Sequence, residues 1–318
     1  MIVGMRVARV WRYPVKSLLG QSSEFIDVVA GGVVGDRRYA IREASGRLGS
    51  GKNTKRFRKI DGLLQYHARY DGDRAIVTFP DGTQVDADDP GIGALLSAAL
   101  GQPVSLERED DGAYVDDGQL HLLTTASLDW LQRTLPEVTA DERRFRPNLV
   151  IECPGDGPVE QDWIGRTLRI GDEVVLRIVA PTERCGMIAL EQDGGVTREP
   201  RVLRHITQNA GLMFGVYADI VSPGRVRVGD AVMPETGSGP QGALPTRSCV
   251  FAQRTRTLGF EPWLPRQEMD LCETRGDTRI CPQGGHRQPA RLSLHRVRFP
   301  SALTERSHGR GRTRTIPA

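Results

Sequence analysis

Cys185 carries the most chemically distinctive side chain of this sequence, because it follows an alternating apolar segment and is preceded directly by Arg184. A cysteine at the end of a strand beside a fixed cation is expected to be partly ionised, since the positive charge favours thiolate over thiol. A thiolate is both a nucleophile and a soft metal ligand. The alternative is an apolar cysteine buried in a core, as most cysteines outside functional sites are.

Four further segments carry side chains that suit a large anionic ligand. They are Tyr13–Ser17 with Gly35–Tyr39, His121–Leu128, Arg143–Ile151, and Glu160–Trp163 with its continuation through Arg169–Asp172 to Cys185. Taken singly, these side chains have ordinary explanations as surface charges, helix caps or turn residues. Together they supply cations, hydroxyl groups and a helix N-terminus, which are the groups that bind phosphate. The sequence therefore predicts a phosphate-bearing ligand.

These segments, in this order, resemble the MOSC proteins, whose family is named for the C-terminal domain of molybdenum cofactor sulfurase. Tyr13–Ser17 followed by Gly35–Arg37 is similar to the signature of the β-barrel domain that commonly precedes MOSC. Phe145–Asn148, then Arg184 and Cys185, are similar to the core domain. The resemblance covers residues 7 to 233 and is strongest to the branch of amidoxime-reducing components and their bacterial counterparts.

The resemblance implies a molybdenum–molybdopterin cofactor with Cys185 as the protein ligand to the metal. It implies a catalytic or anchoring role for Asp162. The residues that it implies for binding the pterin and its phosphate are Lys16, Ser17, Arg37, Thr124, Ser127, Arg146, Asn148 and Arg184. The chain departs from the family around the cysteine, where Pro181–Glu183 precedes it and Gly186–Ile188 follows it. Both departures bear on the choice of substrate.

By the same resemblance we expect an oxidoreductase that reduces small N-hydroxylated compounds. The sequence has no plant-type run of cysteines for an iron–sulfur cluster, so electrons are expected from a separate flavin or iron–sulfur reductase. The alternatives are a sulfur carrier or cofactor-delivery protein that uses Cys185, and a non-catalytic cofactor-binding protein. Pyridoxal phosphate is expected only through a separate desulfurase partner, if at all.

The composition indicates a globular protein without specific nucleic-acid binding. The net charge is +3, but residues 237–318 carry 14 Arg, no Lys and six acidic residues, so the rest of the chain is acidic. No apolar run is long enough to span a membrane, and the N-terminus does not resemble a secretory signal. Five cysteines at irregular spacing do not indicate a disulfide framework, so we expect a cytoplasmic location.

Short alternating segments dominate the first 236 residues, which favours a mainly β fold with inserted helices (α+β). Pro80–Gly82 predicts a hairpin turn, and helical periodicity is clear at 92–100 and 125–135. We expect an N-terminal β-barrel-like domain at 1–108 and a MOSC β-barrel domain that binds the cofactor at 109–236. Gly46–Asn53 nearly fits a nucleotide-binding P-loop, but Asn53 replaces the required hydroxyl residue, so a basic loop near the mouth of a site is favoured.

From Gly237 onward the sequence has little apolar periodicity, many arginines and scattered prolines. Such a segment lacks the patterned apolar surface that offsets the entropy of ordering, so we expect a disordered tail. A chain that ends at Glu235 is therefore expected to fold and to keep its cofactor and activity. Thermal unfolding and cofactor content of the shortened chain test this prediction, and a marked loss of either would contradict it.

Overall fold

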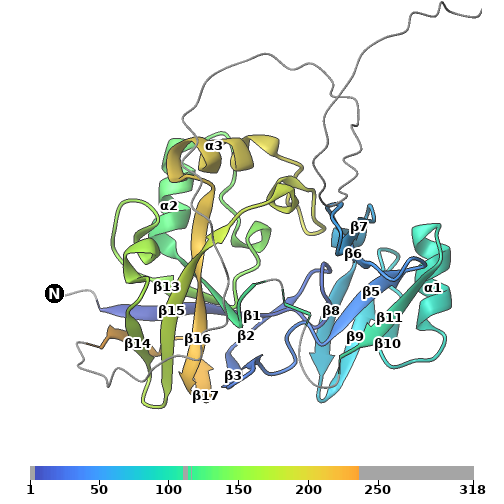
Figure 1. Cartoon of the computed structure of the whole chain (residues 1–318), viewed down its shortest axis with the longest axis horizontal. Coiled ribbons are helices and arrows are strands. Elements are labelled where there is room, and N and C mark those ends of the chain that lie inside the picture. The colour runs from blue at the N-terminus through green and yellow to red at the C-terminus, as the bar shows by residue number, and fades with distance from the viewer. Residues whose placement is uncertain (1–3, 110–113, 116, 236–318) are drawn as a thin grey trace, which may run out of the picture. The chain divides into compact units, whose positions relative to one another are not determined.

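A closed β-barrel is the main feature of the structure (Figure 1). The computed structural model describes residues 4–109, 114–115 and 117–235. The predicted disordered tail at 237–318 lies outside the described residues. Seven strands form the barrel, and the ring closes because β13 pairs with β1. In order around the ring they are β1 (Met5–Arg12), β13 (Leu149–Glu152), β12 (Leu120–Thr124), β16 (Met213–Ser222), β15 (Val174–Glu183), β14 (Thr167–Ile170) and β18 (Ala231–Pro234).

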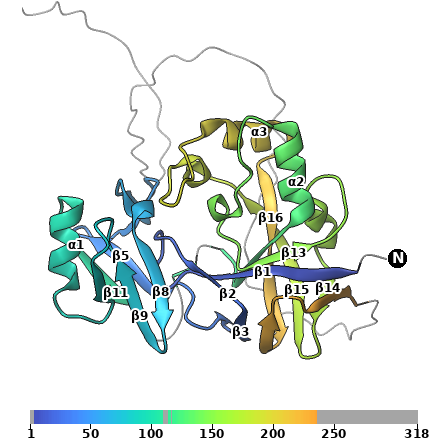
Figure 2. The same ribbon diagram turned by 180° about the vertical axis from the view of Figure 1, so that it is seen from behind.

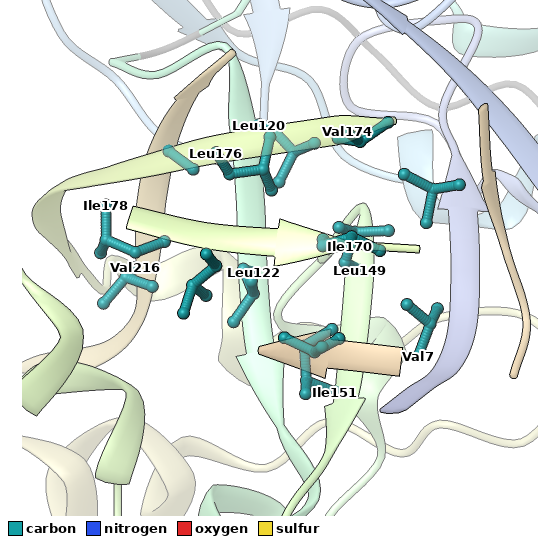
Figure 3. Close-up of a cluster of buried hydrophobic side chains, with 14 of the residues drawn as sticks. Val7, Leu120, Leu122, Leu149, Ile151, Ile170, Val174, Leu176, Ile178 and Val216 are labelled. Atoms are coloured by element: carbon teal, nitrogen blue, oxygen red, sulfur yellow. The ribbon is translucent and has the colours of Figure 1, made fainter. Parts of the chain in front are cut away.

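Aliphatic side chains fill the inside of this barrel (Figure 3). Leu120 and Leu122 from β12 face Leu176 and Ile178 from β15, and all four are fully buried. Side chains alternate along a strand, so only every second position points inward, which is the period that the sequence displays. Burial of each such side chain contributes about 1.5–3 kcal/mol relative to exposure. The barrel is therefore a packed core and not a channel.

A second apolar core lies among smaller sheets formed by the residues between β2 and β12. One sheet has the order β11, β5, β6, β7 and another the order β10, β9, β8. Their bounds are β5 (Tyr39–Glu43), β6 (Leu48–Ser50), β7 (Phe57–Lys59), β8 (His67–Asp71), β9 (Arg74–Thr78), β10 (Gln84–Asp86) and β11 (Val104–Arg108). The turn predicted at Pro80–Gly82 joins β9 to β10, with Gly82 at φ 87°. The predicted mainly β class with inserted helices is confirmed.

The first strand of the chain belongs to the barrel and not to these smaller sheets. β1 pairs with β13 and β18, and also with β2 (Gln21–Ser23). A further sheet joins β17 (Gly224–Arg227) to β3 (Phe25–Val29), which pairs with β4 (Gly32–Val33). The chain thus starts in the barrel, builds the smaller sheets and returns. The domain boundary after residue 108 stays a prediction.

Three α-helices occur in the described part of the chain: α1 (Ile92–Leu100), α2 (Thr125–Thr134) and α3 (Pro200–Ala210). Short 3₁₀ helices are η1 (Leu63–Gln65), η2 (Glu142–Arg144), η3 (Val159–Trp163) and η4 (Gly186–Ala189). α1 and α2 match the sequence prediction closely. Figure 2 shows α2 beside α3, and side chains of both contribute to one apolar cluster. No helix of the described residues is long and apolar enough to cross a membrane.

The sequence prediction missed α3, although its ends carry recognisable signals. Pro200 occupies its first turn, where a missing N–H costs nothing, and Glu199 caps the N-terminus by accepting from the backbone of Arg201. Gly211 ends the helix in the left-handed conformation. Only Val202 and Ile206 are buried within the helix, so its apolar stripe is narrow, and polar residues with two arginines fill the rest of its surface.

Candidate functional site

A pocket of about 890 Å³, its open mouth included, lies among the end of β15, the loop after η2, and the loops after β1, β4 and β6. The pocket brings together seven of the ten residues that the sequence singled out: Lys16, Ser17, Arg37, Arg146, Asn148, Arg184 and Cys185. Residues separated by up to 169 positions therefore meet around one cavity.

Three of these residues hold a backbone conformation that is unfavourable for any residue except glycine. The φ angles are 66° at Ser17, 51° at Arg37 and 55° at Arg146. Among the described residues only one other non-glycine residue, Leu212, has a positive φ. Such a conformation costs on the order of 1–3 kcal/mol for each residue and accumulates where the surrounding structure has a functional reason to impose it. The strain of this chain is thus concentrated at the pocket.

The ring of Tyr13 is the platform that supports two of the strained residues. The guanidinium carbon lies 4.9 Å from the ring centroid for Arg37 and 4.2 Å for Arg146, which is cation–π distance. Asp36 is buried, accepts from the backbone N–H of Tyr13 at 2.7 Å and forms an ion pair with Arg37. Burial also raises the pKa of Tyr13, so its hydroxyl stays neutral. Two like charges are thereby held close together at one side of the pocket.

A buried polar chain connects Arg184 to Arg146 through His121, which the sequence analysis did not select as a site residue. Nη2 of Arg184 lies 2.7 Å from Nε2 of His121, and Nδ1 of His121 lies 3.2 Å from the carbonyl oxygen of Arg146. Because arginine can only donate, Nε2 must accept and Nδ1 must carry the proton. Burial, and then the charge of Arg184, hold the pKa of His121 well below its usual value. His121 is therefore neutral and fixed in one tautomer.

Arg184 does not reach toward the thiol that follows it in sequence. Its Nε donates to the carbonyl of Phe214 at 2.7 Å and its Nη1 to the carbonyl of Phe145 at 3.2 Å. Burial lowers the pKa of Arg184 to about 10, so the side chain remains charged at neutral pH. Its direct role in the structure is to tie β15 to neighbouring segments just before Cys185. Ionisation of the thiol stays a prediction.

Cys185 is half-buried and lies between the C-terminal end of β15 and the start of η4. Arg144, which lies in the segment Arg143–Ile151 but was not selected as a site residue, holds the turn after Cys185 in place. The guanidinium of Arg144 is buried and donates to the carbonyls of Ile188 at 3.3 Å and Thr197 at 2.9 Å. Two carbonyl contacts from a planar, rigid donor fix the path of the chain beyond the cysteine. The position of the thiol is therefore set from both sides.

The charge of the pocket is strongly positive. Six cationic side chains line it, against two carboxylates, Asp117 and Glu183, within the described residues. The cations are Lys16, Arg37, Lys52, Arg144, Arg146 and Arg184. Lys16 is buried and donates to the carbonyl of Tyr114 at 2.8 Å. Concentrated positive charge in a partly desolvated cavity attracts an anionic ligand and strengthens each contact with it.

Thr124, Ser127 and Asp162 do not line the pocket, so their predicted roles stay predictions. Thr124 and Ser127 are fully buried, and their hydroxyls donate to the carboxylate of Glu160 at 2.6 and 2.7 Å. Thr124 also caps α2 by accepting from the backbone of Ser127. Both hydroxyls are thus engaged in hydrogen bonds within the fold, because a buried carboxylate requires hydrogen-bond donors. Asp162 is exposed on η3.

Glu160 is thus a buried carboxyl that the sequence analysis overlooked, with three donors around it. The third is the backbone N–H of Gly215 at 3.0 Å. Gly215 has a φ of 85°, and a side chain there would collide with His121. Glu160 therefore fixes the part of β16 that packs directly behind the pair of His121 and Arg184.

A pH dependence of stability follows from the burial of Glu160, which raises its pKa above the ordinary value of 4.5. The folded state then holds this proton more tightly than the unfolded state. The free energy of unfolding should fall as the pH rises from about 4.5 through the raised pKa. Glu160→Gln should remove this decline, since glutamine does not titrate. Denaturant unfolding of both proteins over that range tests it, and parallel curves would contradict it.

Comparisons with known proteins find one family match and similar curated proteins. Residues 109–233 match the MOSC domain family. The chain is 25% identical over 280 residues to mitochondrial amidoxime-reducing component 1 of Mus musculus, covering 71% of this chain and 81% of that protein. To the Homo sapiens protein of the same name it is 33% identical over 137 residues, which is 39% of each.

Similarity to solved structures is weaker. The YUAD protein from Bacillus subtilis aligns with a TM-score of 0.42 and 11% identity, covering 72% of this chain and 94% of the other. YiiM from Geobacillus stearothermophilus aligns with a TM-score of 0.31 and 17% identity, covering 39% of this chain and 57% of the other.

Proposed function

Because this chain carries a MOSC domain and resembles the mitochondrial amidoxime-reducing component, we propose that its pocket binds a molybdenum–molybdopterin cofactor and that the protein reduces N-hydroxylated compounds. In this reaction the N–OH group, two electrons and two protons yield N–H and water. The electrons come from a separate flavin or iron–sulfur reductase.

The observation that carries the proposal is the convergence of Cys185 with three strained residues, Ser17, Arg37 and Arg146, around one cavity. A fold does not retain such strain without compensation, and here the compensation is the placement of cations and a hydroxyl beside a thiol. Thiolate is the side chain that suits a soft metal, whereas arginine and lysine suit phosphate. The cofactor proposed here carries both a soft metal and a phosphate.

The side chains present fit this cofactor in chemical kind. Lys16, Arg37 and Arg146 would bind the phosphate, with Ser17 beside them, and Cys185 would bind the metal. Asn148 has a supporting role, because its amide accepts from the backbone of His121 at 3.1 Å and donates to the carbonyl of Trp11 at 3.3 Å. It therefore fixes the floor of the pocket.

When bound, the cofactor supplies a metal that exchanges two electrons and accepts an oxygen atom, chemistry that no side chain of this protein provides. The protein would bind and orient the cofactor and shield it from solvent. His121 is neutral and its only proton points at the carbonyl of Arg146, so it positions Arg184 and Arg146 and is not the acid that completes the water molecule.

The proposal is tested by producing the protein in a host that makes molybdenum cofactor and measuring molybdenum, pterin and labile sulfur per chain. We expect near-stoichiometric molybdenum and pterin, and turnover of an amidoxime when an electron donor is supplied. Metal-free protein that carries labile sulfur would instead identify a sulfur carrier.

Lys16→Ala should weaken retention of the cofactor before it affects folding. The substitution removes one charge-assisted contact, which contributes about 1.5–3 kcal/mol when well formed, or roughly a 10- to 150-fold change in affinity. Pterin content after extensive dialysis measures the effect. The matched control is Lys55→Ala, which removes an exposed lysine outside the pocket. Equal pterin content in the two variants would count against a phosphate contact by Lys16.

A further inference from the structure

A second pocket of about 880 Å³, open mouth included, lies beside the first. Its inner wall is formed by Ile60, Leu63 and Leu64, which are buried, and by Leu190. Met187 lines both pockets and lies two residues after Cys185 on η4. The two cavities are therefore neighbours that share one flexible side chain.

The wall between the pockets comes from two distant segments in contact. Ser50 and Lys52 line the first pocket, whereas Gly51 between them lines the second. The hydroxyl of Ser50 lies 3.4 Å from the sulfur of Met187. A β-carbon at Gly51 would come within 2.5 Å of Leu190 and 3.3 Å of Met187. Only glycine allows the loop after β6 to pack this closely against the segment that follows the cysteine.

The chemistry of the second pocket differs from that of the first. Its charged rim is balanced, with Lys59 and Arg198 against Asp61 and Glu191, and Lys59 pairs with Asp61 at 2.9 Å. A rim of balanced charge neither attracts nor repels a net charge. The aliphatic walls below it favour binding of an apolar group, because binding removes apolar surface from water. The first pocket, with its excess of cations, is suited to an anion, and the second to a neutral body.

We propose that the second pocket binds the uncharged apolar body of the N-hydroxylated substrate and that Met187 is the specificity-determining residue between this body and the site at Cys185. The inference rests on the proposed function and names its substrate class. The substrates are neutral N-hydroxylated compounds with an aromatic or aliphatic group large enough to extend beyond Met187 into the second pocket. Methionine suits this place because its unbranched side chain adapts to bodies of different shape.

The test uses cofactor-loaded protein and two amidoximes that differ in the body alone, acetamidoxime and benzamidoxime. Leu190→Phe narrows the second pocket and leaves the residues that line the first unchanged. It should raise the KM for benzamidoxime roughly tenfold and leave that for acetamidoxime within about twofold, since a misfit of a few methylene groups costs this much. Met187→Ala should change the ratio of the two KM values by at least about threefold. Met233→Ala, an exposed methionine outside both pockets, should change neither.

Binding of benzamidoxime without an electron donor, measured by calorimetry, provides a readout that does not depend on turnover. We expect Leu190→Phe to weaken it about tenfold. Equal changes for both amidoximes, or unchanged binding in both pocket variants, would overturn the inference. If the protein contains no molybdenum, the proposed function fails, and calorimetry on that protein still decides whether the second pocket binds the apolar body.

Discussion

Cys185→Ser should leave the fold unchanged and abolish molybdenum-dependent reduction of N-hydroxylated compounds. Serine is nearly isosteric with cysteine, but its hydroxyl is a harder and far less acidic ligand than a thiolate. Loss of a residue that only supports a metal ligand costs 10–100-fold in metal affinity or activity, so loss of the ligand itself should cost at least about 100-fold. Molybdenum per chain and amidoxime turnover measure the effect, and circular dichroism checks the fold.

The matched control is Cys153→Ala, which removes the other free cysteine of the described residues. Cys153 is buried in the barrel core and lines neither pocket, and burial raises its pKa to about 11, so it remains a thiol. Its loss should lower stability slightly and leave the molybdenum content unchanged. Full reductase activity with bound metal in Cys185→Ser would show that the ligand assignment is wrong.

The mainly β fold was predictable because many of its strands are amphipathic and short. The alternation in 174–179 and the hairpin at Pro80–Gly82 follow from the two-residue period of a strand and from glycine in a turn, both of which are local properties. Closure of the ring is not local. It depends on the pairing of β1 with β13, across more than 130 residues, and no window of sequence displays that pairing.

The pocket was predictable in part, because some of its residues stand in short motifs that the sequence displays. Lys16, Arg37 and Arg146 stand in recognisable motifs, so their convergence was expected from the resemblance. Glu160 was missed because a single acidic residue in a polar segment does not reveal that it will be buried. Its burial redirects the hydroxyls of Thr124 and Ser127 away from the pocket. A side chain's partner is a property of the fold, whereas its chemical type is a property of the sequence.

Strain at Arg146 and its charge can be separated experimentally, because only glycine adopts its φ of 55° without cost. Arg146→Ala removes the guanidinium and keeps the strain, whereas Arg146→Gly removes both. The affinity of both variants for the cofactor should fall by about tenfold or more, since each lacks the same charge-assisted contact. The free energy of unfolding of the glycine variant should nevertheless exceed that of the alanine variant by about 1–2 kcal/mol, the cost of a left-handed residue.

Pterin content after dialysis and denaturant unfolding, measured on the same preparations, decide the two parts independently. Arg166→Ala is the control, because Arg166 is exposed and lies outside the pocket. Wild-type pterin content in either Arg146 variant would show that the guanidinium does not hold the phosphate. Equal stability of the two variants would show that the left-handed conformation at residue 146 is imposed without cost. If both expectations hold, Arg146 lowers the stability of the free protein because its conformation places a cation where the cofactor binds.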